Sequence, residues 1–243
     1  MDAKTSQLNA VCFDADDPAR LAVFWAGLLG RERDADAGGA VLVPGDGTGF
    51  LVRFLPAAEP KSGQNQAHFD LTSTSLADQR ATVARALRLG ARPADVGQGP
   101  DEPHVVLADP EGNEFCVIEP GNRFLAGCGF IGALACDGSQ ANGYFWSQAL
   151  NWPLVWDQDQ ETAVQAPHGG TKISWGGPPL NPRTGRTRLH LDLAVAAGGD
   201  AEAETARLVS LGAARLAGGG GREPGGWVDM ADPDGNEFRL LLT

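Results

Sequence analysis

DPEGNEF at residues 109–115 and DPDGNEF at residues 232–238 are nearly the same phrase, found once near the middle of the chain and once near its end. Asp-Pro followed by Gly-Asn is typical of a tight turn, and apolar residues flank each copy. Each copy therefore predicts a β-hairpin. Four residues after the turn glycine, the first copy has Cys116 and the second has Arg239. The two hairpins share their turn and differ at this strand position.

Two further matches in the same order show that the chain is a tandem repeat. The pair FW at residue 24 recurs 121 residues later at residue 145, and HFDL at residue 68 recurs 122 residues later as HLDL at residue 190. The segment EPGNRFLAG at 119–127 interrupts the pattern with Pro and Gly. We therefore expect two domains, residues 1–121 and 126–243.

Each half shows the pattern strand, helix, strands twice over. Residues 9–15 alternate like a strand, and the next segment reads as a helix with Asp17 as N-cap and Pro18 at its first position. The other strands predicted are 40–44, 49–56, 68–72, 105–109, 114–120, 129–135, 172–177, 188–195, 227–232 and 237–242. The other helices predicted are 76–91, 142–152 and 201–213. The prediction is an α+β fold, with a flexible loop at 216–226.

The bulk composition excludes several classes of partner. The 243 residues carry a formal net charge of −12 and contain no cluster of Lys and Arg, which argues against nucleic acid and anionic membranes. No apolar run approaches the ~18 residues that a membrane span needs. The N-terminus lacks the pattern of a secretion signal, and the four cysteines include no CxxC pair. We expect a cytoplasmic protein with reduced thiols.

The arrangement resembles the vicinal oxygen chelate superfamily, also called the glyoxalase/bleomycin-resistance/extradiol-dioxygenase superfamily. The resemblance is carried by DPARLAVFWAGLLG at 17–30, by the HFDL and HLDL strands, and by the DP[ED]GNEF hairpins. It implies two tandem glyoxalase-like domains, each of two βαβββ modules that enclose a ligand cavity. It also implies pairing of the two domains as a fused pseudo-dimer, with a homodimer of the whole chain left open. The superfamily contains metal-dependent enzymes and metal-free antibiotic-binding proteins, so the fold alone does not give the function.

The resemblance implies three metal ligands in each domain: one on the first strand, a His that opens the fifth strand, and a Glu four residues after the turn glycine. The corresponding residues are Ala10, His68 and Cys116 in the first half, and Ile131, His190 and Arg239 in the second. Ala and Ile donate no ligand, and the permanently charged Arg opposes a divalent metal. We therefore expect no metal cofactor. A divalent metal in the first domain, held by His68, Asp70 and Glu114, stays open as an alternative.

Strand alternation predicts which polar side chains share a cavity with each His. The expected sets are Cys12, Asp14, His68, Asp70, Glu114 and Cys116 in the first half, and His190, Asp192, Glu237 and Arg239 in the second. His68 with Glu114, or His190 with Glu237, could act as an acid–base pair. A purely structural role for these groups is favoured over a catalytic one, because buried ion-pair networks also arise without function. An inert core thiol is the favoured role for Cys116, over a nucleophile activated by His68.

Trp175 and Trp227 lie on strands beside the predicted cavities and could stack on a flat ligand. The alternative is that they fill the seam between the domains. These features together predict a metal-independent protein that binds a small apolar or cationic molecule, as antibiotic-binding resistance proteins do. The alternatives are a lyase, isomerase or cyclase that uses a His–carboxylate pair, and a metal-dependent enzyme of the same superfamily.

Overall fold

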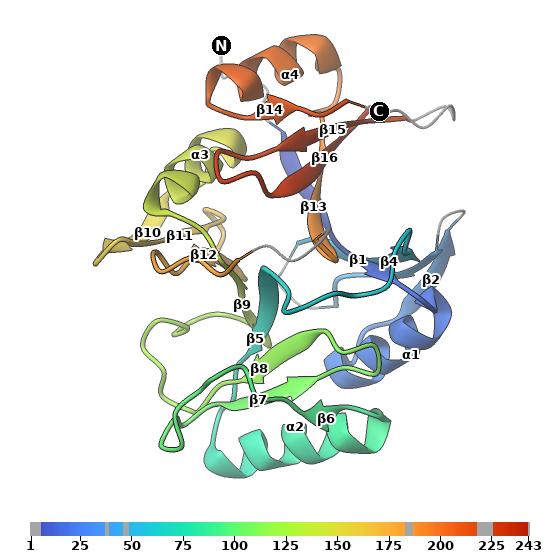
Figure 1. Ribbon diagram of the computed structural model, residues 1–243, viewed down its shortest axis with the longest axis vertical. Helices are drawn as coiled ribbons and strands as arrows, with labels where there is room; N and C mark the ends of the chain where they lie inside the picture. Colours follow the sequence, from blue (N-terminus) through green and yellow to red (C-terminus); the bar gives the residue numbers. More distant parts are fainter. Residues whose placement is uncertain (1–5, 37–38, 46–48, 183–186, 218–225, 243) are drawn as a thin grey trace.

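The computed structural model describes residues 6–36, 39–45, 49–182, 187–217 and 226–242. These residues form four helices and sixteen strands in two eight-stranded sheets (Figure 1), which confirms the predicted α+β fold. Most of the predicted loop at 216–226 lies outside the described residues. Within the described ranges, no helix combines the length and the apolar character needed to cross a membrane.

The chain builds four βαβββ modules in sequence order. Module 1 contains β1 (Gln7–Ala15), α1 (Pro18–Leu29), β2 (Arg33–Asp36), β3 (Gly39–Leu42) and β4 (Leu51–Pro56). Module 2 contains β5 (Ala67–Leu71), α2 (Leu76–Leu89), β6 (Arg92–Pro93), β7 (Val105–Ala108) and β8 (Glu114–Val117). Module 3 contains β9 (Ile131–Cys136), α3 (Gln140–Leu150), β10 (Leu154–Gln158), β11 (Glu161–Gln165) and β12 (Lys172–Trp175). Module 4 contains β13 (Leu189–Ala194), α4 (Ala201–Ser210), β14 (Ala214–Arg215), β15 (Trp227–Ala231) and β16 (Glu237–Leu241).

The first helix begins and ends where its sequence predicts. The Asp17 carboxylate accepts a hydrogen bond from the Arg20 backbone N–H at 3.1 Å, and Pro18 occupies the first turn. Gly30 ends the helix in the left-handed conformation, with φ of 67°. Strands β2, β6, β10, β11 and β14 were not predicted. All five lie toward the outer ends of the two sheets.

Each sheet is shared between the two halves of the chain. Sheet A has the order β14-β15-β16-β13-β1-β4-β3-β2, and sheet B has the order β10-β11-β12-β9-β5-β8-β7-β6. In sheet A, β1 pairs antiparallel with β13 and sets Cys12 opposite His190. In sheet B, β5 pairs antiparallel with β9 and sets His68 opposite Ala135. Modules 1 and 4 therefore share one sheet, and modules 2 and 3 share the other.

This pairing corrects the composition of the two predicted ligand sets. Ala10 lies opposite Asp192 of the second half, and Ile131 lies opposite Leu71 of the first half. His68 therefore shares its sheet with β9 rather than β1. The sequence-based sets were wrong because they assumed that each half closes its own sheet.

The faces of the two sheets that turn toward each other share one hydrophobic core. Phe13 of sheet A and Phe69 of sheet B lie 5.7 Å apart between ring centroids, and Trp25 of α1 contacts both rings. In the second half, Trp146 of α3 packs against Phe238 of β16 at 5.1 Å. The opposite face of each sheet, which we call its outer face, carries the predicted polar residues.

The first aspartate of the repeated DP[ED]GNEF motif has a structural role. Asp109 is fully buried and accepts hydrogen bonds from Trp25 Nε1 at 3.0 Å and from the Asn113 side chain at 2.9 Å. Its other oxygen accepts from the backbone N–H groups of Glu111 and Asn113, both at 2.9 Å. Burial raises the pKa of Asp109, although these hydrogen bonds oppose the rise. The aspartate thus fastens the hairpin turn to α1.

The second copy of the phrase repeats these contacts. Asp232 accepts from Trp146 Nε1 at 3.1 Å, and Asn142 and Asn236 also donate to it. The third residue of each phrase adds a bond to the start of a helix: Glu111 accepts from Asp17 N–H at 2.8 Å, and Asp234 accepts from the Ser139 hydroxyl at 2.8 Å. The DP[ED]GN turns therefore join the two modules within each half, while the sheets join the two halves.

Candidate functional site

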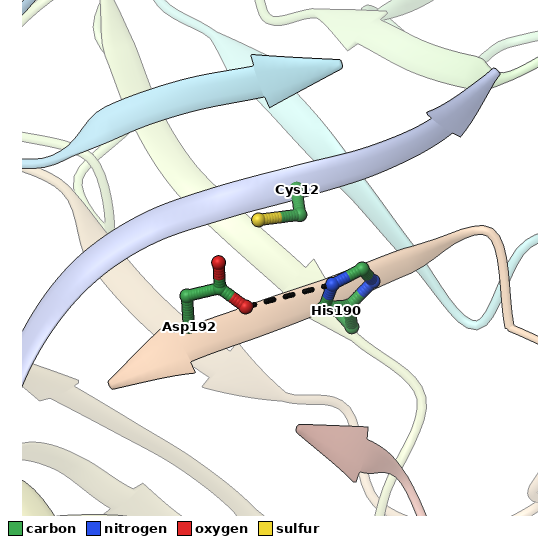
Figure 2. A group of neighbouring side chains, drawn as sticks. All are labelled: Cys12, His190 and Asp192. Carbon is green, nitrogen blue, oxygen red and sulfur yellow. Dashed lines mark ion pairs between the residues drawn. The ribbon is translucent and has the colours of Figure 1, made fainter. Parts of the chain in front are cut away.

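The outer face of sheet A carries a buried cluster of Cys12, His190 and Asp192. Figure 2 shows Cys12 on β1 and the other two residues on β13, with all three side chains close together. His190 Nε2 lies 3.5 Å from an Asp192 oxygen. Cys12 is fully buried, and the His190 and Asp192 side chains are only 6% and 1% exposed.

Two arginines flank this cluster. Arg53 of β4 donates from Nη1 to Asp192 at 3.2 Å. Arg239 of β16 lies 3.4 Å from Asp229 and stands over the Trp227 ring at 5.0 Å from its centroid. Trp227 also donates from Nε1 to Asp229 at 2.9 Å. The predicted residues Trp227 and Arg239 are thus engaged with each other and with a carboxylate.

Burial is the main influence on ionisation in this cluster. It raises the pKa of Asp192, although the hydrogen bond with Cys12 and the charges of Arg239 and Arg53 lower it. Burial and the neighbouring Asp192 raise the pKa of Cys12 well above its usual value. The thiol therefore stays protonated at neutral pH, which removes it as a nucleophile or a thiolate ligand.

The outer face of sheet B carries the pseudo-equivalent cluster of His68, Asp70 and Cys116. His68 Nε2 lies 3.4 Å from Asp70 Oδ1, and β5 and β8 set Asp70 beside Cys116. The His68 side chain is 33% exposed, so this imidazole reaches solvent where His190 does not. The two clusters share a His and an Asp, but their thiols come from different strands.

His68 is a cationic group at neutral pH. Partial burial lowers its pKa, but hydrogen bonds to Asp70 and Cys116 and their negative charge outweigh this effect and raise it to about 10. The predicted role of His68 as a general base does not suit this state, since a general base must be unprotonated at the working pH. A protonated imidazole can instead donate hydrogen bonds or a proton.

The predicted carboxylate partners lie elsewhere. Glu114 bonds Lys61 Nζ at 2.9 Å and the Asn65 backbone N–H at 3.2 Å, so the carboxylate closest to His68 is Asp70. Glu237 and Asp14 line a small cavity of ≈ 10 Å³ beside His190. A cavity of this size has no room for an organic ligand.

Trp175 faces the core rather than an outer face. It is 1% exposed and stacks on Trp146, with ring centroids 6.5 Å apart. Both indoles line a mainly apolar cavity of ≈ 40 Å³ at the seam between the sheets, together with Leu134 and Leu189. For Trp175 this outcome matches the alternative that the tryptophans fill the seam, whereas Trp227 contacts Arg239 and Asp229 in sheet A. The sheet B residue that corresponds to Arg53 is Ser174, the neighbour of Trp175. Ser174 pairs with Ala135 of β9 in the same way as Arg53 pairs with Cys12 of β1.

On each outer face, directly paired residues of neighbouring strands form a row that starts at His68 or His190. These two rows differ in the size and charge of their side chains. In sheet B the row runs His68, Ala135, Ser174, Ala163, Trp156. In sheet A it runs His190, Cys12, Arg53, Val41, Asp34. Directly paired side chains point to the same side of a sheet, so each row lies on one surface. In sheet B, Ala135 and Ser174 are half-buried and Ala163 is fully buried, whereas the corresponding row of sheet A contains the long cationic side chain of Arg53.

The linker between the halves borders the sheet B row. The ring centroids of Phe124 and Trp156 lie 5.6 Å apart. Lys172 Nζ lies 4.6 Å from the Phe124 ring centroid in a cation–π contact and donates a hydrogen bond to the Phe124 carbonyl oxygen. Leu125 is buried in the same small cluster as Cys116. The linker therefore covers the Cys116 side of the outer face, while Ala135 and Ser174 stay half-exposed.

The two outer faces differ in how well they would suit the metal chelate that the fold family implies. In sheet A, Arg53 and Arg239 place positive charge beside the donors, and the Cys12 thiol stays protonated. In sheet B, His68, Asp70 and Cys116 bring three donor atoms within 4.8 Å, and all three come from module 2. The facing strand β9 has alanines at Ala133 and Ala135, so any metal on this face would take its protein ligands from module 2 alone.

Comparison with known proteins places the chain in a family. The glyoxalase-like domain family matches residues 10–118 and again residues 132–241, and the protein belongs to this family. The two matches confirm the predicted resemblance and the tandem repeat. No curated protein sequence gives a significant match.

Solved structures support the same fold at low sequence identity. Glyoxalase I from Zea mays superposes with a TM-score of 0.64 at 16% identity, covering 98% of this chain and 92% of that one. A putative dioxygenase from Bacillus subtilis subsp. subtilis str. 168 gives a TM-score of 0.62 at 14% identity, covering 98% and 85%. At this identity the likeness concerns the fold alone.

Sequence reasoning gave no role to Trp156 or Arg53. Trp156 lies on β10, where a register shift between Leu154 and Trp156 breaks the alternation that would have marked its face. Arg53 could have been found, because it is the single charged residue in the otherwise apolar strand 49–56.

Proposed function

We propose that the protein binds a small, largely apolar molecule on the outer face of sheet B, without a metal ion. The observation that supports the proposal is that two small side chains, Ala135 and Ser174, stay half-buried in the row between His68 and Trp156, although Ala163 of the same row is fully buried. Aromatic rings with a few polar anchors are typical of small-molecule sites. A cationic ligand is less favoured, because protonated His68 stands at the polar end.

In this proposal the outer face of sheet A has a structural role. Its Asp192 is neutralised by Arg53, and the space over the row is occupied by the guanidinium group. A reduced-thiol, cytoplasmic setting and a homodimer of the whole chain stay predictions.

Exchanging the two key residues tests the proposal. Ser174→Arg should fill sheet B as Arg53 fills sheet A, and should abolish binding of the compounds found in a thermal-shift screen. Arg53→Ser is the matched control and should leave that binding intact. Elemental mass spectrometry of the same preparations should find near-zero zinc, iron, manganese and nickel. Binding that survives Ser174→Arg, or about one metal ion per chain, would contradict the proposal.

A second candidate function is favoured by the His68–Asp70 pair. A protonated imidazole held by a carboxylate can act as a general acid in a lyase or isomerase reaction. Turnover of a bound compound would identify an enzyme, and His68→Gln should then slow it by roughly 10²-fold or more. Unchanged turnover in His68→Gln would exclude this role.

A further inference from the structure

Residues 122–128 of the linker, which we call the strap, lie on the outer face of sheet B. Directly paired residues share one surface, so the row next to the His68 row, two residues along each strand, belongs to the same face. That row contains Val106, Cys116, Asp70, Ala133, Lys172 and Gln165. The strap contacts both ends of this row. It therefore crosses the proposed ligand site.

One side chain of the strap is inserted into the face. Leu125 is only 6% exposed. It packs in an apolar cluster with Val106, Cys116, Ile118 and Ala133. Strand β9 leaves room for it at Gly132, where a Cβ atom would lie 3.0 Å from Leu125 Cδ1. The isobutyl group of Leu125 thus occupies apolar space on the outer face.

The hydrogen bonds between the strap and sheet B come from side chains. Over the described residues, the backbone–backbone hydrogen bonds of 122–128 stay within this segment. Lys172 donates to the Phe124 carbonyl oxygen and lies 4.6 Å from the centroid of its ring. Gln165 donates to the Cys128 sulfur at 3.7 Å. The strap can therefore leave the face without breaking any strand pairing.

Departure of the strap changes the surroundings of Lys172. Its side chain is half-buried and holds the carbonyl oxygen and the ring of Phe124. A partly buried ammonium group that loses its acceptor is unfavourable. An anionic oxygen group on a ligand would replace the carbonyl and form a stronger, charge-assisted hydrogen bond. An apolar group on the same ligand would replace the Leu125 side chain.

We infer that the strap is an autoinhibitory element, and that the ligand is an apolar compound with an anionic oxygen group that displaces it. The apolar part takes the place of Leu125, and the anionic group binds Lys172 in place of the Phe124 carbonyl. Ala135 and Ser174 lie in the adjoining row, where a ligand first contacts the face. This inference rests on the proposed function, and it adds the ligand class and the regulation of the same site.

The test measures trypsin cleavage after Arg123, an exposed residue of the strap. Cleavage requires local opening, so its rate reports the displaced strap. The probe is 8-anilinonaphthalene-1-sulfonate, an apolar anion whose fluorescence also reports its binding. A saturating concentration of the probe should speed cleavage after Arg123 in the full chain by at least about fivefold. Cleavage at the other sites of the chain is the internal control and should not rise.

Two substitutions release the strap in different ways, and both should speed cleavage after Arg123 without the probe. Leu125→Ala removes the apolar contact and keeps Lys172, so it should bind the probe at least about tenfold more tightly than the parent protein does. Lys172→Met removes the anchor of the anion, so it should bind the probe about tenfold more weakly than Leu125→Ala. Leu87→Ala, at a 43% exposed leucine of α2, is the matched control and should change neither quantity.

The outcomes separate this inference from the proposed function. The strap does not control the site if the probe leaves cleavage after Arg123 unchanged or slows it, or if Leu125→Ala binds the probe no more tightly than the parent protein. Equal affinity of Lys172→Met and Leu125→Ala would overturn the anionic ligand class. Adding Ser174→Arg to Leu125→Ala should abolish the gained binding, which a merely loosened core would not show. The proposed function still stands without the strap if compounds bind the parent protein and Ser174→Arg alone blocks them.

Discussion

At the scale of single residues, the two histidines show how neighbouring groups decide chemistry. His190 and His68 occupy equivalent strand positions, and each lies near an Asp two residues along the strand. His190 is covered, and a second charge, Arg53, competes for its aspartate. His68 is partly exposed, and no cation competes for Asp70 among the ion pairs described. The same sequence motif therefore gives a structural group in one sheet and an accessible one in the other.

The first prediction concerns the ionisation of His68. Its ring protons should titrate by NMR near pH 10 instead of near 6.5, the ordinary value for His. Asp70→Asn should lower this pKa by about one unit or more, because it removes one of the causes of the rise. A ring that titrates near 6.5 in both proteins would contradict this reading.

The raised pKa of His68 also gives the second prediction, which concerns how the unfolding free energy depends on pH. The folded-state pKa of His68 is raised, so its contribution is fully present below pH 6.5 and is lost as the pH rises toward about 10. The difference in unfolding free energy between the parent protein and His68→Gln should therefore shrink across this window. Urea unfolding at several pH values measures it, and a difference that grows with pH would refute the sign.

The third prediction tests the aspartate of the repeated phrase. Asp109→Ala removes four hydrogen bonds from a fully buried position and leaves the Trp25 N–H without its acceptor. We expect a loss of about 3 kcal/mol or more in unfolding free energy, measured by urea denaturation. Asp101→Ala, at an exposed position, is the control and should change stability by less than about 0.5 kcal/mol. Equal effects of the two changes would contradict the proposed role of the turn.

At the scale of elements, the packing of α3 on β11 depends on a glycine. A Cβ atom on Gly143 would lie 2.0 Å from Thr162 Oγ1 and 2.4 Å from Thr162 Cβ. In α1, a Cβ atom on Gly27 would meet only the end of the Leu89 side chain, at 3.0 Å. The two helices therefore approach their neighbours at different distances.

This difference gives the fourth prediction. Gly143→Ala should lower the unfolding free energy by about 2 kcal/mol or more, since the helix must move away from β11. Gly27→Ala should be close to neutral, because Leu89 can rotate and Ala favours the helix by about 1 kcal/mol. Thermal unfolding of both variants measures the contrast. Equal stability of the two would show that α3 can shift freely.

The helix ends could be predicted from the sequence, whereas the strand partners could not. The start of α1 follows from Asp17 and Pro18, and the ends of α1 and α2 fall at Gly30 and Gly90, because caps are local signals. Alternation correctly put His68 and Asp70 on one face. It could not tell which strand lies beside them, because that depends on pairing between residues more than 60 apart, such as His68 with Ala135. The first-half set was therefore wrong in its β1 residues, which lie in sheet A, whereas the second-half set does lie on the neighbouring strands β13 and β16.

At the scale of the whole molecule, the cross-paired sheets make the halves interdependent. Residues 1–121 alone would leave β1 without β13 and β5 without β9. Unpaired central strands expose backbone groups that seek a partner. The fifth prediction is that neither 1–121 nor 126–243 is a folded monomer alone, while mixing them yields a 1:1 complex. Size-exclusion chromatography with light scattering tests this. Two independently folded monomers would contradict the shared sheets.

The asymmetry of the two outer faces is also a property of the whole molecule. Duplication of one domain would have produced two equivalent faces. The faces now differ at one corresponding position, which is Arg53 in sheet A and Ser174 in sheet B. In the proposed function, the outer face of sheet A is part of the scaffold, and the outer face of sheet B keeps the partly exposed His68 beside small side chains. The central claim is that ligands bind to sheet B only.

The most direct measurement is a crystal structure of the protein with the tightest compound from the screen. The account predicts electron density over Ala135 and Ser174, between His68 and Trp156, with sheet A unchanged. Density beside His190 and Arg53 on sheet A, with the sheet B row empty, would contradict the account.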